Sequence, residues 1–222
     1  MRVAEPNPFS APATVEGRSP RAVRRRDPSE FTTPFRLFAW LLGGGAVALL
    51  AGIAFILVTV GIDGQKQRTT EEMASIAPAI MVGGLAYLAG GAAMVAAIVF
   101  QMILTYRAWE IVQDGAQRTT PGKAVGFMFI PLFNFYWFFV AKYGLAKDLN
   151  RFIETHGIEA RRASPGLGLA CAIMMLLSAI PLIGLYALIP ALVILVIFLK
   201  QIANTAAEIV QFQADQADGA IS

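Results

Sequence analysis

The longest stretches of this sequence without a charged residue are too long and too apolar for the interior of a soluble domain. Residues Leu37–Ile62 form an uncharged run of 26 residues, which as an α-helix would be about 39 Å long. A hydrocarbon core of roughly 30 Å needs about 20 such residues, so this run is long enough to cross a membrane. Residues 79–106 and 167–199 form two further uncharged runs. The sequence therefore predicts an all-α integral membrane protein.

Composition supports the same class. Charged residues make up 15% of the chain and hydrophobic residues 56%, whereas about a quarter of the residues of a soluble domain are charged. The net charge of +3 is small, and the charges are gathered in the segments between the apolar runs. The positions of the charged residues are therefore informative about membrane topology, whereas the small net charge says little about binding partners.

The N-terminal segment, residues 1–33, is predicted to be a disordered cytoplasmic tail. It contains five prolines and no apolar periodicity, so it cannot bury enough surface to offset the entropy lost on ordering. Binding of anionic lipid or nucleic acid is one interpretation of the arginines that precede the first span, and a signal for membrane topology is the one we favour. We expect no nucleic-acid partner. These arginines are Arg18, Arg21, Arg24, Arg25, Arg26 and Arg36.

The second apolar run is preceded by a helix-start signal. Thr69 and Glu72 have the spacing of a capping box, which predicts a helix starting near Thr70. A single helix from there to residue 112 would be too long for one span. We expect Pro78 to end a short first helix and the span itself to cover residues 79–106. Small residues at four-residue spacing predict close helix packing on two faces: Gly44, Ala48 and Gly52, and Ala89, Ala93 and Ala97.

The segment 124–141 is uncharged over 18 residues but is not expected to cross the membrane. Pro131 and Asn134 lie in its middle, where an unbroken helix tolerates them least. A crossing would also place seven of the 18 basic residues outside, against the positive-inside rule. We predict a re-entrant or interfacial aromatic segment, with one leg entering as far as Pro131 and a helix returning from there.

The last apolar run is predicted to be a hairpin, because Pro181, Gly184 and Pro190 interrupt its 33 residues. Two short spans, about 167–183 and 186–200, give about four transmembrane helices together with the earlier spans at 37–62 and 79–106. Only two of the 18 basic residues then lie outside. The membrane domain is expected to cover residues 34–214, followed by a flexible tail at 215–222. Both termini are expected in the cytoplasm and the protein in the inner membrane.

The stretch from Tyr106 to Asn150 resembles a group of uncharacterised bacterial multi-pass membrane proteins, known only as a domain of unknown function. The positions that carry the resemblance are Arg107 to Trp109, Pro121, Gly126-Phe127, Ile130-Pro131, Asn134 and Tyr136-Trp137. The resemblance implies a bacterial inner-membrane protein with an amphipathic helix after the aromatic stretch. It implies no established activity, and it brings no catalytic residues.

The sequence favours a structural or interaction module over two alternatives. Its expected partners are membrane lipids, another membrane protein or a second copy of the chain. The proposed ligand or partner contacts gather around the aromatic-basic segment: Asn134, Tyr136, Trp137, Arg107, Glu110 and Lys142. Aromatic rings followed by lysines and arginines are typical of the headgroup level of a membrane.

The first alternative is a small-solute transporter or channel subunit. Coupled transport commonly leaves ionisable residues inside the spans, and the three long runs contain none, although interrupted helices can form midplane sites. The second is a membrane-interface enzyme, which would need Glu110, Asp148 and His156 to converge. We expect no enzymatic activity, no cofactor and no metal, because a lone Cys171 and a lone His156 make neither a disulfide nor a metal site unaided.

Overall fold

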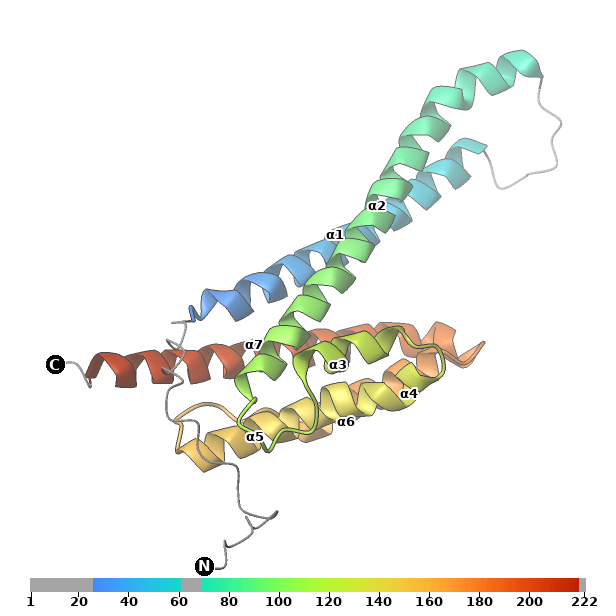
Figure 1. Cartoon of the computed structure of the whole chain (residues 1–222). Coiled ribbons are helices and arrows are strands. Elements are labelled where there is room, and N and C mark those ends of the chain that lie inside the picture. The colour runs from blue at the N-terminus through green and yellow to red at the C-terminus, as the bar shows by residue number, and fades with distance from the viewer. Residues whose placement is uncertain (1–25, 61–68, 220–222) are drawn as a thin grey trace, which may run out of the picture.

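The computed structural model describes residues 26–60 and 69–219, and every regular element within them is helical (Figure 1). The all-α prediction is therefore confirmed for this part of the chain. The expectations for residues 1–25 lie outside the described residues. The elements in chain order are α1 (Ser29–Val60), α2 (Thr70–Ile111), α3 (Pro121–Gly126), the 3₁₀ turn η1 (Phe127–Phe129), α4 (Phe133–Phe138), the π-helical segment η2 (Phe139–Gly144), α5 (Leu145–His156), α6 (Pro165–Ser178) and α7 (Ile183–Gly219).

Three of the described helices are long and apolar enough to cross a membrane. They are α1, α2 and the part of α7 from Tyr186 to Gly219. The chain thus has the build of a multi-pass membrane protein. The prediction of about four spans is confirmed only in this coarser form, because α6 has 14 residues and measures about 21 Å along its axis.

Several helix boundaries differ from the sequence-based ones. Helix α1 begins at Ser29, so residues 29–33 are helical and not part of a disordered tail. The capping box at Thr69 is present, but Pro78 does not end a first helix, since α2 continues through it to Ile111. A proline near the start of a 42-residue helix removes one hydrogen bond among many. Helix α7 likewise runs to Gly219, past the predicted start of a flexible tail at 215.

Helices α1 and α2 form a closely packed antiparallel hairpin, and glycines let their backbones approach (Figure 1). A Cβ added at Gly52 would lie 2.7 Å from the Gly83 carbonyl oxygen, and one at Gly90 would lie 2.6 Å from the Leu49 nitrogen. Gly44, by contrast, faces open space. The predicted close packing on small residues is present at Gly52 and Ala97. The contact face repeats every seven residues, as in a supercoiled pair, rather than every four: Phe31, Phe38, Gly45 and Gly52 on α1, and Gly83, Gly90, Ala97 and Leu104 on α2.

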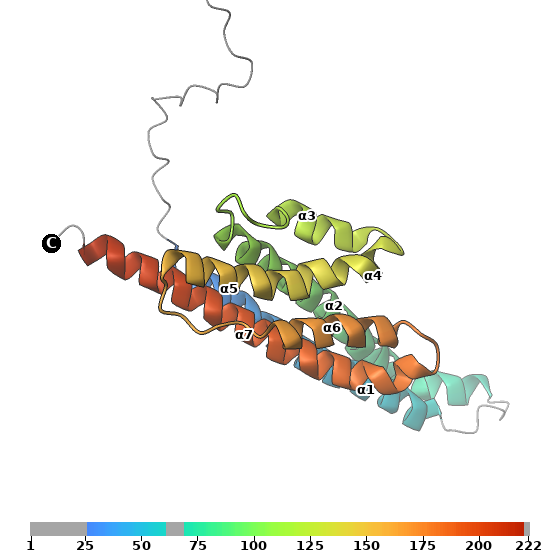
Figure 2. The same cartoon turned by 90° about the horizontal axis from the view of Figure 1, so that it is seen from below.

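The end of the molecule near residue 219 is built around a compact hydrophobic core. Here α7 packs against α6 and against both helices of the α1–α2 hairpin. Helix α5 covers α7 from another side (Figure 2). Arg26, Asp27 and Pro28 lie close to Gln211 and Ala214 around one surface hollow, so the two described ends of the chain share this side. The core contains fully buried side chains from five helices, α1, α2, α5, α6 and α7: Phe31 and Phe38, Leu104, Ala108 and Trp109, Leu145 and Leu149, Cys171, and Phe198, Ile202, Ala206 and Ile209.

Two tight turns of the same kind end the two shorter hairpins. Ile130-Pro131-Leu132 joins η1 to α4, and Ile180-Pro181-Leu182 joins α6 to α7. Both leucines have positive φ, 64° in the first turn and 68° in the second. In each turn the residue after the leucine donates its N–H to the proline carbonyl, at 2.7 and 2.8 Å. Both turns lie at the same end of the molecule, away from the C-terminus (Figures 1 and 2).

Candidate functional site

The predicted re-entrant segment is a small helical hairpin closed by its own aromatic side chains. Helix α3 and η1 lead to the turn at Ile130–Leu132, and α4 returns beside them. The Trp137 Nε1–H donates to the Ala124 carbonyl at 3.0 Å. The Phe127 ring packs edge-on against the rings of Trp137 and Phe133, with centroids 4.8 and 5.6 Å away. We call residues 121–138 the aromatic hairpin.

The aromatic hairpin buries its base and exposes its tip. Trp137 is buried, whereas Leu132 at the turn is 80% exposed and Tyr136 is 62% exposed. Phe129 and Ile130 next to the turn are exposed as well. The returning helix starts at Phe133 rather than at Pro131, so Asn134 is helical, and its buried Oδ1 has no hydrogen-bond partner among the described residues.

Lys142 lies inside the protein and not at the headgroup level. Its side chain is 1% exposed, and its Nζ is 3.2 Å from the Thr105 Oγ1 of α2. Among the described residues no carboxylate lies within ion-pair distance. Burial lowers the pKa of the Lys142 ammonium from 10.5 to about 8, and the nearby Cys171 of α6 offsets part of this effect. The backbone around Lys142 supports α6 directly, because a Cβ at Gly168 would lie 2.9 Å from the Lys142 carbonyl oxygen.

Arg107 and Glu110 are directed toward the start of α1. The Arg107 Nη1 donates to the Glu30 carbonyl at 2.6 Å, and Glu110 lies 3.4 Å from the Arg26 guanidinium. Both also line an open groove of about 320 Å³ beside α3, together with Val99, Met102, Ile103, Tyr106 and Val125. The six predicted contact residues therefore occupy three places, namely the aromatic hairpin, the buried Lys142 and this groove.

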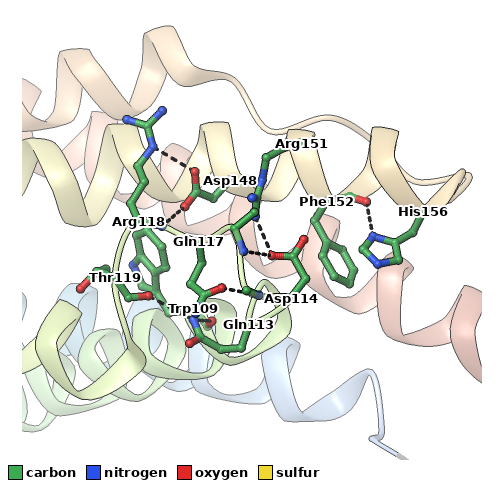
Figure 3. Close-up of polar contacts among 12 residues, drawn as sticks. Trp109, Gln113, Asp114, Gln117, Arg118, Thr119, Asp148, Arg151, Phe152 and His156 are labelled. Atoms are coloured by element: carbon green, nitrogen blue, oxygen red, sulfur yellow. Dashed lines mark hydrogen bonds and ion pairs between the residues drawn. The ribbon is translucent and has the colours of Figure 1, made fainter. Parts of the chain in front are cut away.

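A polar network that sequence reasoning missed fastens the connection between α2 and α3 to α5 (Figure 3). The buried Asp148 carboxylate accepts from the Arg118 backbone N–H at 2.9 Å and from its Nε–H at 3.0 Å. Arg151 donates to Asp114 Oδ1 at 3.0 Å. The Ala116 N–H bonds the same carboxyl and holds the pKa of Asp114 below its usual range.

The signal for this network is in the sequence. Asp148 lies three residues after Leu145 and one before Leu149, in the middle of the apolar stripe of α5. A carboxylate on a buried helix face needs a partner, and Arg118 is that partner. The enzyme alternative is not supported by these contacts, because Glu110 pairs with Arg26 and Asp148 with Arg118, while the His156 Nδ1 lies 3.0 Å from the Phe152 carbonyl oxygen.

We expect Asp148→Asn to destabilise the fold, because the Arg118 guanidinium and N–H would lose their ionised acceptor. Hydrogen bonds to a charged group are worth about 1.5–3 kcal/mol, so we expect a loss of about 2 kcal/mol. The free energy of unfolding in mixed detergent micelles measures it. Glu159→Gln is the matched control, because Glu159 is exposed. Equal stability of the two variants would contradict the structural role of Asp148.

Comparison with known proteins gives no relative. No family model, curated protein or solved structure matches this chain. The resemblance of residues 106–150 to a family of unknown function therefore stays an expectation. Within residues 26–60 and 69–219, no three His, Cys, Asp or Glu side chains come together in a group that could hold a metal ion.

Proposed function

We propose that this chain is a structural or interaction module of the bacterial inner membrane, and that its aromatic hairpin contacts the lipids of one leaflet. The observation that carries the proposal is the contrast between base and tip. The base is fixed by the buried Trp137 and its bond to Ala124, whereas Leu132 at the tip is exposed, as is Tyr136 on α4. An exposed apolar tip on a rigid base suits hydrocarbon, since a water-facing turn would favour polar residues.

The position of a lysine also supports a hairpin whose tip enters the lipid. Lys123 is exposed and lies on the first leg of the hairpin, away from the turn, and the exposed Lys147 follows the hairpin in α5. The six residues from 124 to 129 place the turn roughly 9 Å beyond Lys123 along the hairpin. Interfacial helices bury their apolar faces about 5–10 Å into the headgroup and acyl boundary. Lys123 can therefore remain among phosphates while the tip lies among acyl chains.

The transporter alternative finds less support in these contacts. A transport site needs polar groups that converge on an accessible cavity. Lys142 is enclosed by protein, with its ammonium against Thr105. Asn134 lies in the aromatic hairpin, in a different part of the fold. The contacts favour a module that positions surfaces in the membrane.

Photo-crosslinking in vesicles tests the proposal. We would place a benzophenone amino acid at Leu132 or Tyr136 of the full chain, reconstituted in vesicles of a zwitterionic and an anionic phospholipid. We expect a covalent lipid adduct, seen as a mass increase of one phospholipid, from both positions. Position Glu159, exposed in the loop after α5, is the control and should give no adduct. A crosslink to a second copy in place of the lipid adduct would overturn the assignment to lipid.

A further inference from the structure

The turn between α6 and α7 repeats the turn of the aromatic hairpin in sequence, backbone conformation and exposure. Both contain Ile-Pro-Leu, both place the leucine at positive φ, and both expose it, Leu182 at 77%. A tyrosine follows four residues after each leucine, and Tyr186 is 85% exposed. The two tips are built in the same way and lie at the same end of the molecule (Figure 2), so we expect the same kind of surroundings for both.

We infer that α6 and α7 form a second re-entrant hairpin, whose tip turns back inside the hydrocarbon instead of reaching the aqueous phase on the far side. The first argument is length. Helix α6 has 14 residues, and the apolar part of α7 from Ile183 to Leu199 has 17, so the arms measure about 21 and 26 Å. The α6 arm is shorter than a hydrocarbon core of roughly 30 Å. Helix α7 is by itself long enough to cross, but the turn that starts it lies at the end of the short α6.

The inclination of the hairpin shortens its reach further. The α1–α2 hairpin extends well beyond the α6–α7 turn, and the two hairpins are inclined to each other (Figure 1). With α1 and α2 crossing the bilayer, α6 and α7 are tilted within it. A tilted helix spans less of the membrane thickness than its axial length.

The α1–α2 connection and the α6–α7 turn differ in their charged residues, as expected if the first lies in water and the second in lipid. The connection between α1 and α2 contains Asp63, Lys66 and Arg68, as expected of a segment in water. The turn between α6 and α7 contains no charged residue, and Ile180, Leu182 and Ile183 are exposed on it. Three exposed aliphatic side chains in succession around a proline are compatible with lipid and costly in water.

The backbone of the turn also suits an environment without water. The amides of Ala179, Ile180, Ile183 and Gly184 all donate to carbonyls within the hairpin tip, at 2.7 to 3.2 Å, and Pro181 has no N–H. The Ser178 hydroxyl donates to the Met175 carbonyl at 2.8 Å. Irregular backbone at membrane depth is tolerated only where its polar groups are satisfied. The turn meets that condition for these four amides through its own hydrogen bonds.

The experiment uses single cysteines in the full chain with Cys171→Ala. Leu182→Cys is the reporter. Glu159→Cys marks the side of the membrane on which most basic residues are expected, here called the basic side, and Gln65→Cys marks the connection between α1 and α2. Right-side-out and inverted vesicles are treated with a membrane-impermeant maleimide. We expect the two markers to be labelled from opposite sides. Leu182→Cys should be labelled from neither side, and should become reactive when detergent is added.

Three results would overturn the inference. Labelling of Leu182→Cys from the side of Gln65→Cys would show that α6 and α7 cross completely. Labelling from the side of Glu159→Cys would show that the tip lies in water on the basic side. A spin label at position 182 separates lipid from burial in a partner: frequent collision with oxygen but not with a water-soluble nickel complex is expected, and protection from both would overturn the inference. None of these results affects the aromatic hairpin, which is tested separately at Leu132 and Tyr136.

Discussion

Gly90→Val is expected to separate α1 from α2 and to be among the most damaging substitutions in the membrane domain. A Cβ at position 90 would lie 2.6 Å from the Leu49 nitrogen and 2.7 Å from the Gly45 carbonyl oxygen. Both atoms are helix backbone, so neither can turn away as a side chain could. Overpacking of this kind costs about 1–3 kcal/mol and sometimes more, and we expect about 3 kcal/mol here. Unfolding by sodium dodecyl sulfate, followed by circular dichroism, measures the loss.

The neighbouring glycine supplies the control. A Cβ at Gly91 would meet nothing within 4 Å, although it lies in the same turn of the same helix. Gly91→Val should therefore change the unfolding free energy by less than about 0.5 kcal/mol. If the two variants were equally stable, the close glycine contact between α1 and α2 would not be what holds the hairpin together.

Lys142→Met is expected to stabilise the protein at neutral pH and to abolish part of its pH dependence. The folded-state pKa of about 8 lies below the ordinary 10.5, so between these two values the unfolded chain binds more protons and stability rises with pH. Below pH 8 the full cost of burying the ammonium remains, about 3 kcal/mol at about 1.4 kcal/mol per tenfold change in proton affinity. Methionine fills a similar volume without the charge. The Thr105 hydroxyl keeps its bond to the Gln101 carbonyl.

The measurement is the free energy of unfolding of both proteins from pH 7 to pH 10.5. We expect the variant to be more stable at pH 7, by up to about 3 kcal/mol, with the difference disappearing toward pH 10.5. Lys123→Met is the matched control, since Lys123 is exposed, and it should leave the wild-type profile unchanged. A Lys142→Met profile parallel to the wild type would mean that the ammonium is not buried in solution.

The sequence predicts the helical membrane class and the interruption of the last apolar run because these depend on local composition. A 26-residue run without charge has few alternatives in water, and a proline between two short apolar segments favours a turn. The aromatic hairpin follows in the same way from Pro131, although its returning helix begins two residues later than predicted. The extent of α2 was predicted wrongly, because Pro78 near a helix start is tolerated when the rest of the helix is long.

The arrangement of the candidate site could not be predicted from local patterns. Arg107 and Glu110 have the spacing of a helical ion pair, yet Arg107 contacts Glu30 of α1, 77 residues earlier in the chain, and Glu110 contacts Arg26 just before α1. Lys142 follows an aromatic run and was expected among headgroups, but the π-helical turn and the close approach of Gly168 enclose it. These contacts depend on packing between residues far apart in the chain, which local patterns in a single sequence do not predict.

The π-helical segment η2 determines how α4 and α5, the two helices that it joins, are rotated relative to each other. From Phe133 to His156 the chain is one continuous helix, with the aromatic cluster at one end and the core-facing stripe of α5 at the other. A π turn holds about one residue more than an α turn, and one residue corresponds to a rotation of roughly 100°. The six residues from Phe139 to Gly144 thus set the angle between the face that packs on α7 and the face that carries Tyr136. Loss of one residue there would leave both helices intact and aim the aromatic tip in a different direction.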